Sequence, residues 1–156
     1  MASLEVITEL PRPARRAPDS NKGNYGKVLV VAGSRGMSGA AVLSGSGALR
    51  GGAGLVTVAV PEEILPIVAS SNPCYLTAAL PQDKEGKLVS SSQINELTQA
   101  NDVAAVGPGL GRSAEVTKLE KILSGILSNF LITRGCPACP SQPAPGRWPS
   151  RWPALV

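Results

Sequence analysis

A chain of 156 residues is long enough for one domain with its own hydrophobic core. Aromatic residues make up 3% of it, while 17 glycines and 14 prolines are present, so we expect a core of Val, Ala, Leu and Ile, as in a parallel α/β sheet. The absence of histidine excludes His-based triads and HExxH zinc sites, and the mild net charge of +4 disfavours nucleic-acid binding.

The N-terminal residues 1–20 contain three prolines, which prevent a continuous helix, and we expect an N-terminal arm here. They show no signal-peptide pattern, and no apolar run in the chain reaches membrane-spanning length, so we expect a cytoplasmic protein. The polar loop over 21–26 fits a plain turn better than its alternative, a loop in which Lys22 and the backbone approach an anionic ligand.

Residues 27–60 predict a β-α-β unit, around which the rest of the chain is organised. Residues 27–32 are an apolar, β-branched strand of the kind that parallel sheets bury on both faces. A glycine turn at 33–36 follows, and then a helix over 37–49 made of small residues, which can lie very close to a sheet or a ligand. Residues 55–60 form the next buried strand, so the helix connects two parallel strands.

The middle of the chain predicts further alternation of helices and strands. The expected elements are a helix over 61–69, a strand over 74–80, a charged turn over 81–86, a capped amphipathic helix over 90–99 and a strand over 102–106. The last helix carries Ile94 and Leu97 on one face, as a helix that covers a sheet requires.

The segment 107–111, Gly-Pro-Gly-Leu-Gly, directly follows a buried strand. In open α/β sheets, ligands lie outside the carboxyl ends of the strands, and glycines let the backbone approach a ligand closely. Ser113 is expected to cap a core helix that runs to about residue 127, and residues 129–133 are expected to begin another strand.

Residues 134–156 differ from everything before them. They contain six prolines and no acidic residue, which excludes a helix or a central strand. Cys136 and Cys139 have CxxC spacing, but the chain supplies neither a second ligand pair nor a histidine, so we predict no metal site. Our interpretation is a non-native or disordered tail that results from a shifted reading frame or a truncated gene.

Generic glycine motifs match this chain poorly. Gly33, Gly36 and Gly39 have GxxGxxG spacing rather than the GxGxxG of dinucleotide-binding folds, and no lysine follows them as a Walker A loop requires. A Rossmann-type NAD(P) oxidoreductase fragment nevertheless stays an alternative, with Glu62 at the end of the second strand as the acid that would contact the ribose.

A longer pattern is more specific. The segments KGNYGKVLVVAGS, SGAAVLSGSGALRGGAGLVTVAVPEE and DVAAVGPGLG, in this order, resemble the ATP- or ADP-dependent NAD(P)H-hydrate dehydratases over residues 20–128. The resemblance implies a three-layer, ribokinase-like α/β fold with a parallel sheet. We expect residues 21–133 to form part of such a domain, truncated before its second half.

The resemblance also implies a function in nicotinamide cofactor repair. Such lyases use ATP or ADP, with Mg²⁺, to phosphorylate the hydroxyl group that hydration adds to the S epimer of NADH or NADPH. Phosphate then leaves, and the normal cofactor is restored. The family works together with an NAD(P)H-hydrate epimerase, and the intact enzymes are expected to form homo-oligomers.

Residue by residue, the resemblance places Ala40, its neighbour Ala41, and Gly109 at the hydrated cofactor. Lys22 and Gly23 match the family's KG loop, although this chain has Asn21 where the family usually has histidine.

The family's PHxGE-type segment, its nucleotide-binding lysine loop and its GTGD-type motif, whose aspartate is the expected base, do not occur in this chain. We therefore assign no catalytic residue and expect the chain alone to be inactive, with an open sheet edge and exposed apolar surface. A non-catalytic interaction subunit that binds partners through this edge or the basic tail is the remaining alternative.

Overall fold

The computed structural model describes residues 15–119 and the backbone of residues 130–132. Expectations for residues 1–14 and for the tail 134–156, including Cys136 and Cys139, lie outside these residues. The elements in chain order are the 3-10 turn η1 (Lys22–Tyr25), β1 (Lys27–Val31), α1 (Ser38–Arg50), β2 (Leu55–Pro61), the 3-10 turn η2 (Glu62–Ile64), α2 (Leu65–Ser71), β3 (Leu76–Leu80), α3 (Ser92–Gln99), β4 (Val103–Val106) and β5 (Phe130–Ile132). Residues 114–119 are also helical.

The strands form one five-stranded sheet in the order β3-β2-β1-β4-β5, and every neighbouring pair is parallel. β1 lies at the centre, where Val30 is paired with Val58 of β2 on one side and with Ala105 of β4 on the other. All five predicted strands are therefore confirmed, with boundaries shifted by at most two residues at either end.

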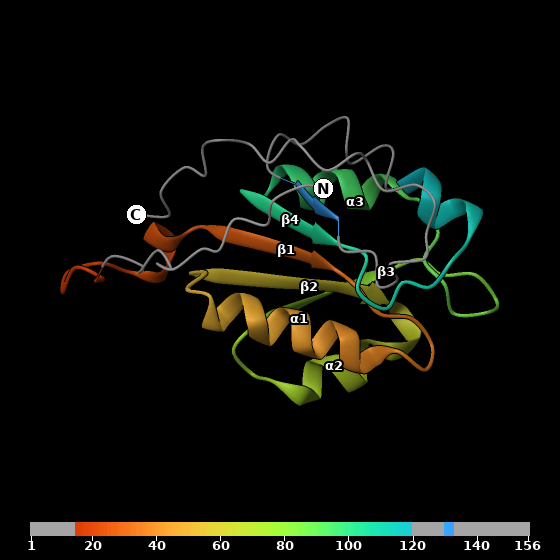
Figure 1. Ribbon diagram of the computed structural model, residues 1–156, viewed down its shortest axis with the longest axis horizontal. Helices are drawn as coiled ribbons and strands as arrows, with labels where there is room; N and C mark the ends of the chain where they lie inside the picture. Colours follow the sequence, from red (N-terminus) through yellow and green to blue (C-terminus); the bar gives the residue numbers. More distant parts are fainter. Residues whose placement is uncertain (1–14, 120–129, 133–156) are drawn as a thin grey trace, which may run out of the picture.

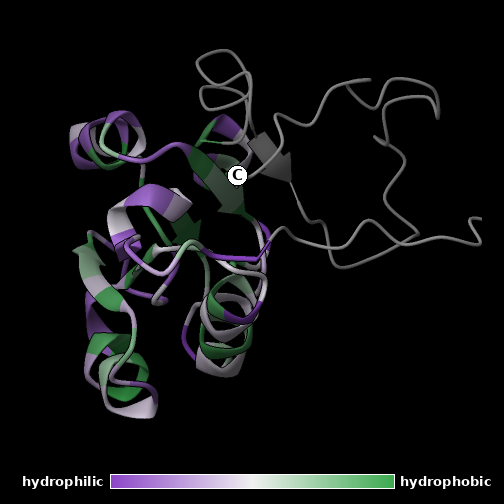
Figure 2. Cartoon of the chain, turned by 90° about the vertical axis from the view of Figure 1, so that its left-hand side faces the viewer, coloured by the Kyte–Doolittle hydropathy of each residue, from purple (hydrophilic) through white to green (hydrophobic). Residues whose placement is uncertain are grey.

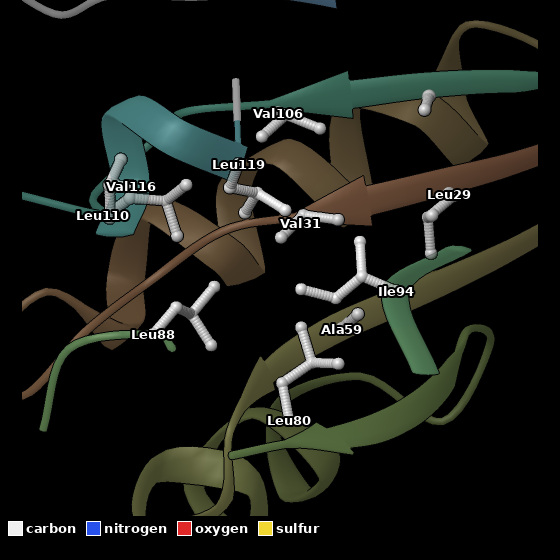
Figure 3. Packing of buried hydrophobic residues seen from close by; sticks show 11 residues of the cluster. Leu29, Val31, Ala59, Leu80, Leu88, Ile94, Val106, Leu110, Val116 and Leu119 are labelled. Atoms are coloured by element: carbon white, nitrogen blue, oxygen red, sulfur yellow. The ribbon is translucent and has the colours of Figure 1, made fainter. Parts of the chain in front are cut away.

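Helices cover both faces of the sheet, which gives the expected three layers (Figure 1). Alternating residues of β1 enter two different cores, as the period of a strand requires. Leu29 and Val31 lie in a cluster with Ile94 of α3 and Leu119 (Figure 3). Val30 lies in the other cluster, which α1 and α2 cover. The central strands of the sheet are accordingly coloured as hydrophobic, whereas the helices carry mixed colours (Figure 2).

Small residues let α1 lie directly on the sheet, as predicted. A methyl group added to Gly45 would lie 2.7 Å from Cγ2 of Val58 in β2 and 3.2 Å from the ring of Tyr75. Ala41, one turn earlier, is completely buried. Since Leu or Ile at either position would push the helix outward, the small-residue composition sets the distance between these layers.

The predicted helix over 61–69 begins too early. Pro61 is the last residue of β2, where it is paired with Leu80, and its backbone is extended (φ −50°, ψ 138°). A 3-10 turn follows, and α2 begins only at Leu65, with Pro66 in its first turn. The proline that starts the helix is therefore Pro66, because the fixed φ of proline suits a first helical turn.

The two predicted serine caps have different outcomes. The Ser113 hydroxyl accepts a hydrogen bond of 3.1 Å from the Val116 amide, so the cap of the helix at 114–119 is confirmed. Ser91 stands at the N-cap of α3, but its hydroxyl is buried and makes no capping bond with the described residues. The prediction of a capped α3 is therefore wrong in this detail.

Candidate functional site

Two glycine-containing loops meet at the carboxyl edge of the sheet. The loop 33–37 follows β1, and the loop 107–111 follows β4, the strand paired with β1 (Figure 1). The chain continues from β1 to β2 on one side, while β4 returns on the other side. This is the point of an open α/β sheet where the strand order reverses, and ligands bind in the crevice beside such a point.

Hydrogen bonds connect the two loops directly. The Gly33 amide donates to the carbonyl of Pro108 at 2.8 Å, and the Gly107 amide donates to the carbonyl of Val31 at 3.2 Å. The Ser34 hydroxyl donates to the Gly109 carbonyl at 2.7 Å. The loops therefore form one structural unit, although they are distant in sequence.

Ala40 and Gly109, the two main residues of the expected substrate contact, lie side by side. A methyl group placed on Gly109 would lie 2.7 Å from Cβ of Ala40 and 3.0 Å from the Met37 carbonyl oxygen. The backbone of Gly109 is left-handed, with φ of +69°. Both its conformation and its contact with Ala40 thus require glycine here. Ala40 and Gly109 are each half-buried, which leaves part of both accessible to a ligand.

Ala41 points the other way. It is 0% exposed, and its methyl group lies in the core between α1 and the sheet, 3.2 Å from where Gly33 would carry a methyl group. Its side chain has no surface for a ligand to contact. Ala41 therefore supports the loop that begins at Gly33 from the interior.

Lys22 and Gly23 lie at the opposite edge of the sheet. They belong to η1, which precedes β1, whereas the two glycine loops follow β1 and β4 (Figure 1). The Gly23 amide donates to Oδ1 of Asn21 at 2.8 Å, so it is already occupied within a capped turn. The structure does not bring Lys22 and Gly23 to Ala40 and Gly109, and the plain turn is the better description of this loop.

A polar cluster at the carboxyl edge was missed by the sequence reasoning. Arg35, in the loop after β1, contacts the Glu63 carboxylate through Nε at 2.9 Å and Nη2 at 2.7 Å. Gln82, after β3, donates to the same carboxylate at 3.1 Å. The cluster thus connects the segments that follow β1, β2 and β3. The sequence Gly-Ser-Arg-Gly at 33–36 predicts a turn but does not indicate that Arg35 pairs with Glu63.

Hydrogen bonds within this cluster change the acidity of its members. The bond from Arg35, followed by that from Gln82, lowers the pKa of Glu63 below its usual value. The bond to Glu63 raises the pKa of Arg35. The two side chains are 54% and 41% exposed, so solvent screens the pair. Glu62, the acid of the Rossmann-type alternative, is exposed beside them.

The site offers a ligand a surface of small residues and polar groups of the backbone. Its described loops supply the glycine backbone, the Ala40 methyl group and the half-exposed Met37. Among residues 15–119, no three His, Cys, Asp or Glu side chains cluster closely enough to hold a metal ion. No helix in the part of the chain that the structure describes could cross a membrane.

The solved structures that resemble this chain share its fold. A ribokinase-like superfamily protein from Enterococcus faecalis matches with a TM-score of 0.62 at 24% identity, over 77% of this chain and 40% of that one. The ADP/ATP-dependent NAD(P)H-hydrate dehydratase from Bacillus subtilis, co-crystallised with ATP and Mg²⁺, matches with a TM-score of 0.57 at 26% identity, over 78% and 41%. The three-layer, ribokinase-like fold is thereby confirmed.

Sequence comparisons agree. The chain is 36% identical to the bifunctional NAD(P)H-hydrate repair enzyme Nnr of Thermofilum pendens over 85% of its own length, and spans 25% of that enzyme. It is 36% identical to the ADP-dependent (S)-NAD(P)H-hydrate dehydratase of Lactococcus lactis, over 69% of this chain and 35% of that one. The family model of NAD(P)H-hydrate dehydratase matches residues 28–136. This chain belongs to the NAD(P)H-hydrate dehydratase family.

Proposed function

We propose that the described residues bind the hydrated nicotinamide dinucleotide on which an ATP- or ADP-dependent (S)-NAD(P)H-hydrate dehydratase acts. The observation that carries the proposal is the contact between Ala40 and Gly109, at the point where the strand order reverses. The family membership supports the choice of substrate, and it favours this function over a Rossmann-type oxidoreductase that would bind unmodified NAD(P) through Gly33, Gly36 and Gly39.

The small residues suit a large, flat ligand. A methyl group on Gly36 or Gly39 would meet no other atom within 4 Å, so space is open in front of both. Ala40 and Gly109 would limit how far the hydrated ring enters. The residues of this chain therefore hold and orient the ring and exclude water from one side of it.

The phosphate donor and the partner follow from the resemblance. ATP or ADP, with Mg²⁺, would supply the phosphoryl group for the ring hydroxyl, and the relative from Bacillus subtilis was co-crystallised with ATP and Mg²⁺. Residues 15–119 supply no group of three metal-ligating side chains for this ion. The name "bifunctional" of several relatives supports an epimerase as the functional partner, and a homo-oligomer is the expected assembly.

Calorimetric titration of the purified chain tests the proposal. We expect hydrated NADH to bind more tightly than NADH, and Ala40→Leu to abolish the difference because its side chain would fill the space beside Gly109. Ala69→Leu, at an exposed position of α2, is the matched control and should bind as the parent does. Equal binding of both nucleotides by the parent chain would contradict the proposal.

Two further measurements separate the alternatives. Addition of ATP to the chain with hydrated NADH should give no increase in the absorbance of reduced nicotinamide, since the motifs assigned to phosphate transfer do not occur among the 156 residues. Turnover would refute the expectation of inactivity. Loss of NAD binding on Glu62→Ala would instead favour the Rossmann-type alternative.

A further inference from the structure

Ser34 is an unusual residue of the site because its polar side chain is buried. It is 3% exposed, a degree of burial that the polar side chain of Thr98 shares. Burial of a hydroxyl group is unfavourable unless the group finds a hydrogen-bonding partner. The Ser34 hydroxyl has one, the Gly109 carbonyl oxygen at 2.7 Å, across a separation of 75 residues.

This bond fixes one particular peptide unit. The carbonyl of Gly109 and the amide of Leu110 belong to the same planar group and point in opposite directions. Ser34 holds the carbonyl, and the Leu110 amide donates to the Gly107 carbonyl at 3.2 Å. Both sides of the unit are thus held in place, next to a glycine that would otherwise have wide conformational freedom.

Through its backbone carbonyl, Ser34 also acts on the Ala40 side of the contact between Ala40 and Gly109. Its carbonyl accepts a hydrogen bond of 2.8 Å from the Met37 amide, and the Met37 carbonyl in turn accepts one of 3.2 Å from Ala40. The same Met37 carbonyl lies against Gly109. One residue therefore sets the positions of both Ala40 and Gly109.

We propose that Ser34 is a positioning residue for the hydrated nicotinamide ring, which it serves by fixing the orientation of Gly109 relative to Ala40. The inference rests on the proposed function for the identity of the ligand. It goes beyond that function by assigning a role to a side chain that does not itself touch the ligand.

The test compares Ser34→Ala with Tyr75→Phe. The Tyr75 hydroxyl is also buried and also donates to a backbone carbonyl, that of Val68, at 2.8 Å, but Tyr75 directly precedes β3, at the amino edge, and its ring lies against Gly45 of α1. Each variant loses one buried hydrogen bond, so both should lower the unfolding temperature to a similar extent.

Affinity and local exchange then separate positioning from stability. We expect Ser34→Ala to raise the Kd for hydrated NADH about tenfold and Tyr75→Phe to leave it within about twofold. In the absence of ligand, hydrogen exchange at the Leu110 amide should be faster in Ser34→Ala alone. Ser34→Thr, which retains the donor oxygen, should recover both properties.

Equal effects of the two variants on Kd and on Leu110 exchange would overturn the inference. If the parent chain does not bind hydrated NADH but Ser34→Ala still accelerates exchange at Leu110, the proposed function fails while the role of Ser34 in fixing Gly109 stands. If Ser34→Ala does not fold, Ser34→Cys, with its weaker donor, is measured instead, and unchanged exchange at Leu110 would overturn the inference.

Discussion

Gly54 at the amino edge of the sheet and Gly36 and Gly39 at the carboxyl edge have opposite surroundings. At the amino edge, a methyl group on Gly54 would lie 1.7 Å from the carbonyl oxygen of Lys22, so the space in front of this glycine is filled by the chain's own backbone. At the carboxyl edge, Gly36 and Gly39 have no atom within 4 Å of such a methyl group. Gly54 thus packs against the chain's own backbone, while Gly36 and Gly39 leave open surface near the contact between Ala40 and Gly109.

The largest effect is expected for Gly54→Ala. A methyl group at 1.7 Å from a backbone oxygen cannot be accommodated by the rotation of a side chain, so η1 has to move. We expect the free energy of unfolding to fall by about 3 kcal/mol, the upper part of the range for overpacking. Urea denaturation measures this, and an unchanged midpoint would show that η1 does not pack against Gly54.

Gly109→Ala tests the effect of an added methyl group at the carboxyl edge. Both the left-handed backbone (φ +69°) and the contact with Ala40 oppose the added methyl group, and we expect a loss of about 2 kcal/mol together with weaker binding of hydrated NADH. Gly111→Ala is the matched control, since its φ is +73° but its nearest neighbour would be 3.7 Å away. Equal losses in the two variants would mean that the contact with Ala40 contributes nothing.

Gly39→Ala should separate stability from binding. Gly39 is exposed in the first turn of α1 and has open space, so alanine should stabilise the helix by about 0.5 kcal/mol, while its methyl group occupies part of the proposed ligand surface. Gly47→Ala, equally open but near the far end of α1, should stabilise the protein without a change in affinity. Thermal unfolding and calorimetric titration measure the two properties, and equal affinities of the two variants would place the ligand elsewhere.

The smallest effect concerns pH. Because the folded-state pKa of Glu63 is lowered, its contribution to stability is present above the unfolded-state pKa and is lost as the pH falls through the folded-state pKa. Below about pH 5, the unfolding temperature of the parent chain should therefore fall slightly more steeply than that of Glu63→Gln. High salt should reduce the difference, since the pair with Arg35 is exposed. Glu96→Gln, on α3 and outside this cluster, serves as the reference, and identical pH profiles of all three would contradict the assignment.

Local patterns were sufficient for the strands but not for the residue that starts α2. Runs such as 27–32 and 102–106 are apolar and bounded by polar or glycine residues, which identifies buried strands. Pro61 was assigned to a helix because proline also suits a first helical turn, but its pairing with Leu80 shows that it ends β2. Such pairing depends on residues that are distant in the sequence, and local propensity carries no information about them.

The candidate site was only partly predictable for the same reason. The glycines at 33–36 and 107–111 identified the loops, and the position of ligands in α/β sheets placed them at one edge. Ala40 is half-buried at the site whereas Ala41 is fully buried, and this difference depends on the rotation of α1 about its axis. Because α1 consists of small residues, its sequence shows no clear hydrophobic face from which this rotation could be predicted. Lys22 was linked to a ligand by its polar loop and by the resemblance, although its position before the strand at 27–32 already places it at the amino edge.

The separation of 75 residues between Ser34 and Gly109 has a consequence for folding order. β1, β2 and β3 can associate through short connections, but β4 must then add to the free side of β1, which closes a much longer loop. During synthesis, the first three strands can assemble before Gly109 has left the ribosome. An assembly of β1 to β3 alone would therefore lack Gly109, and with it one side of the crevice.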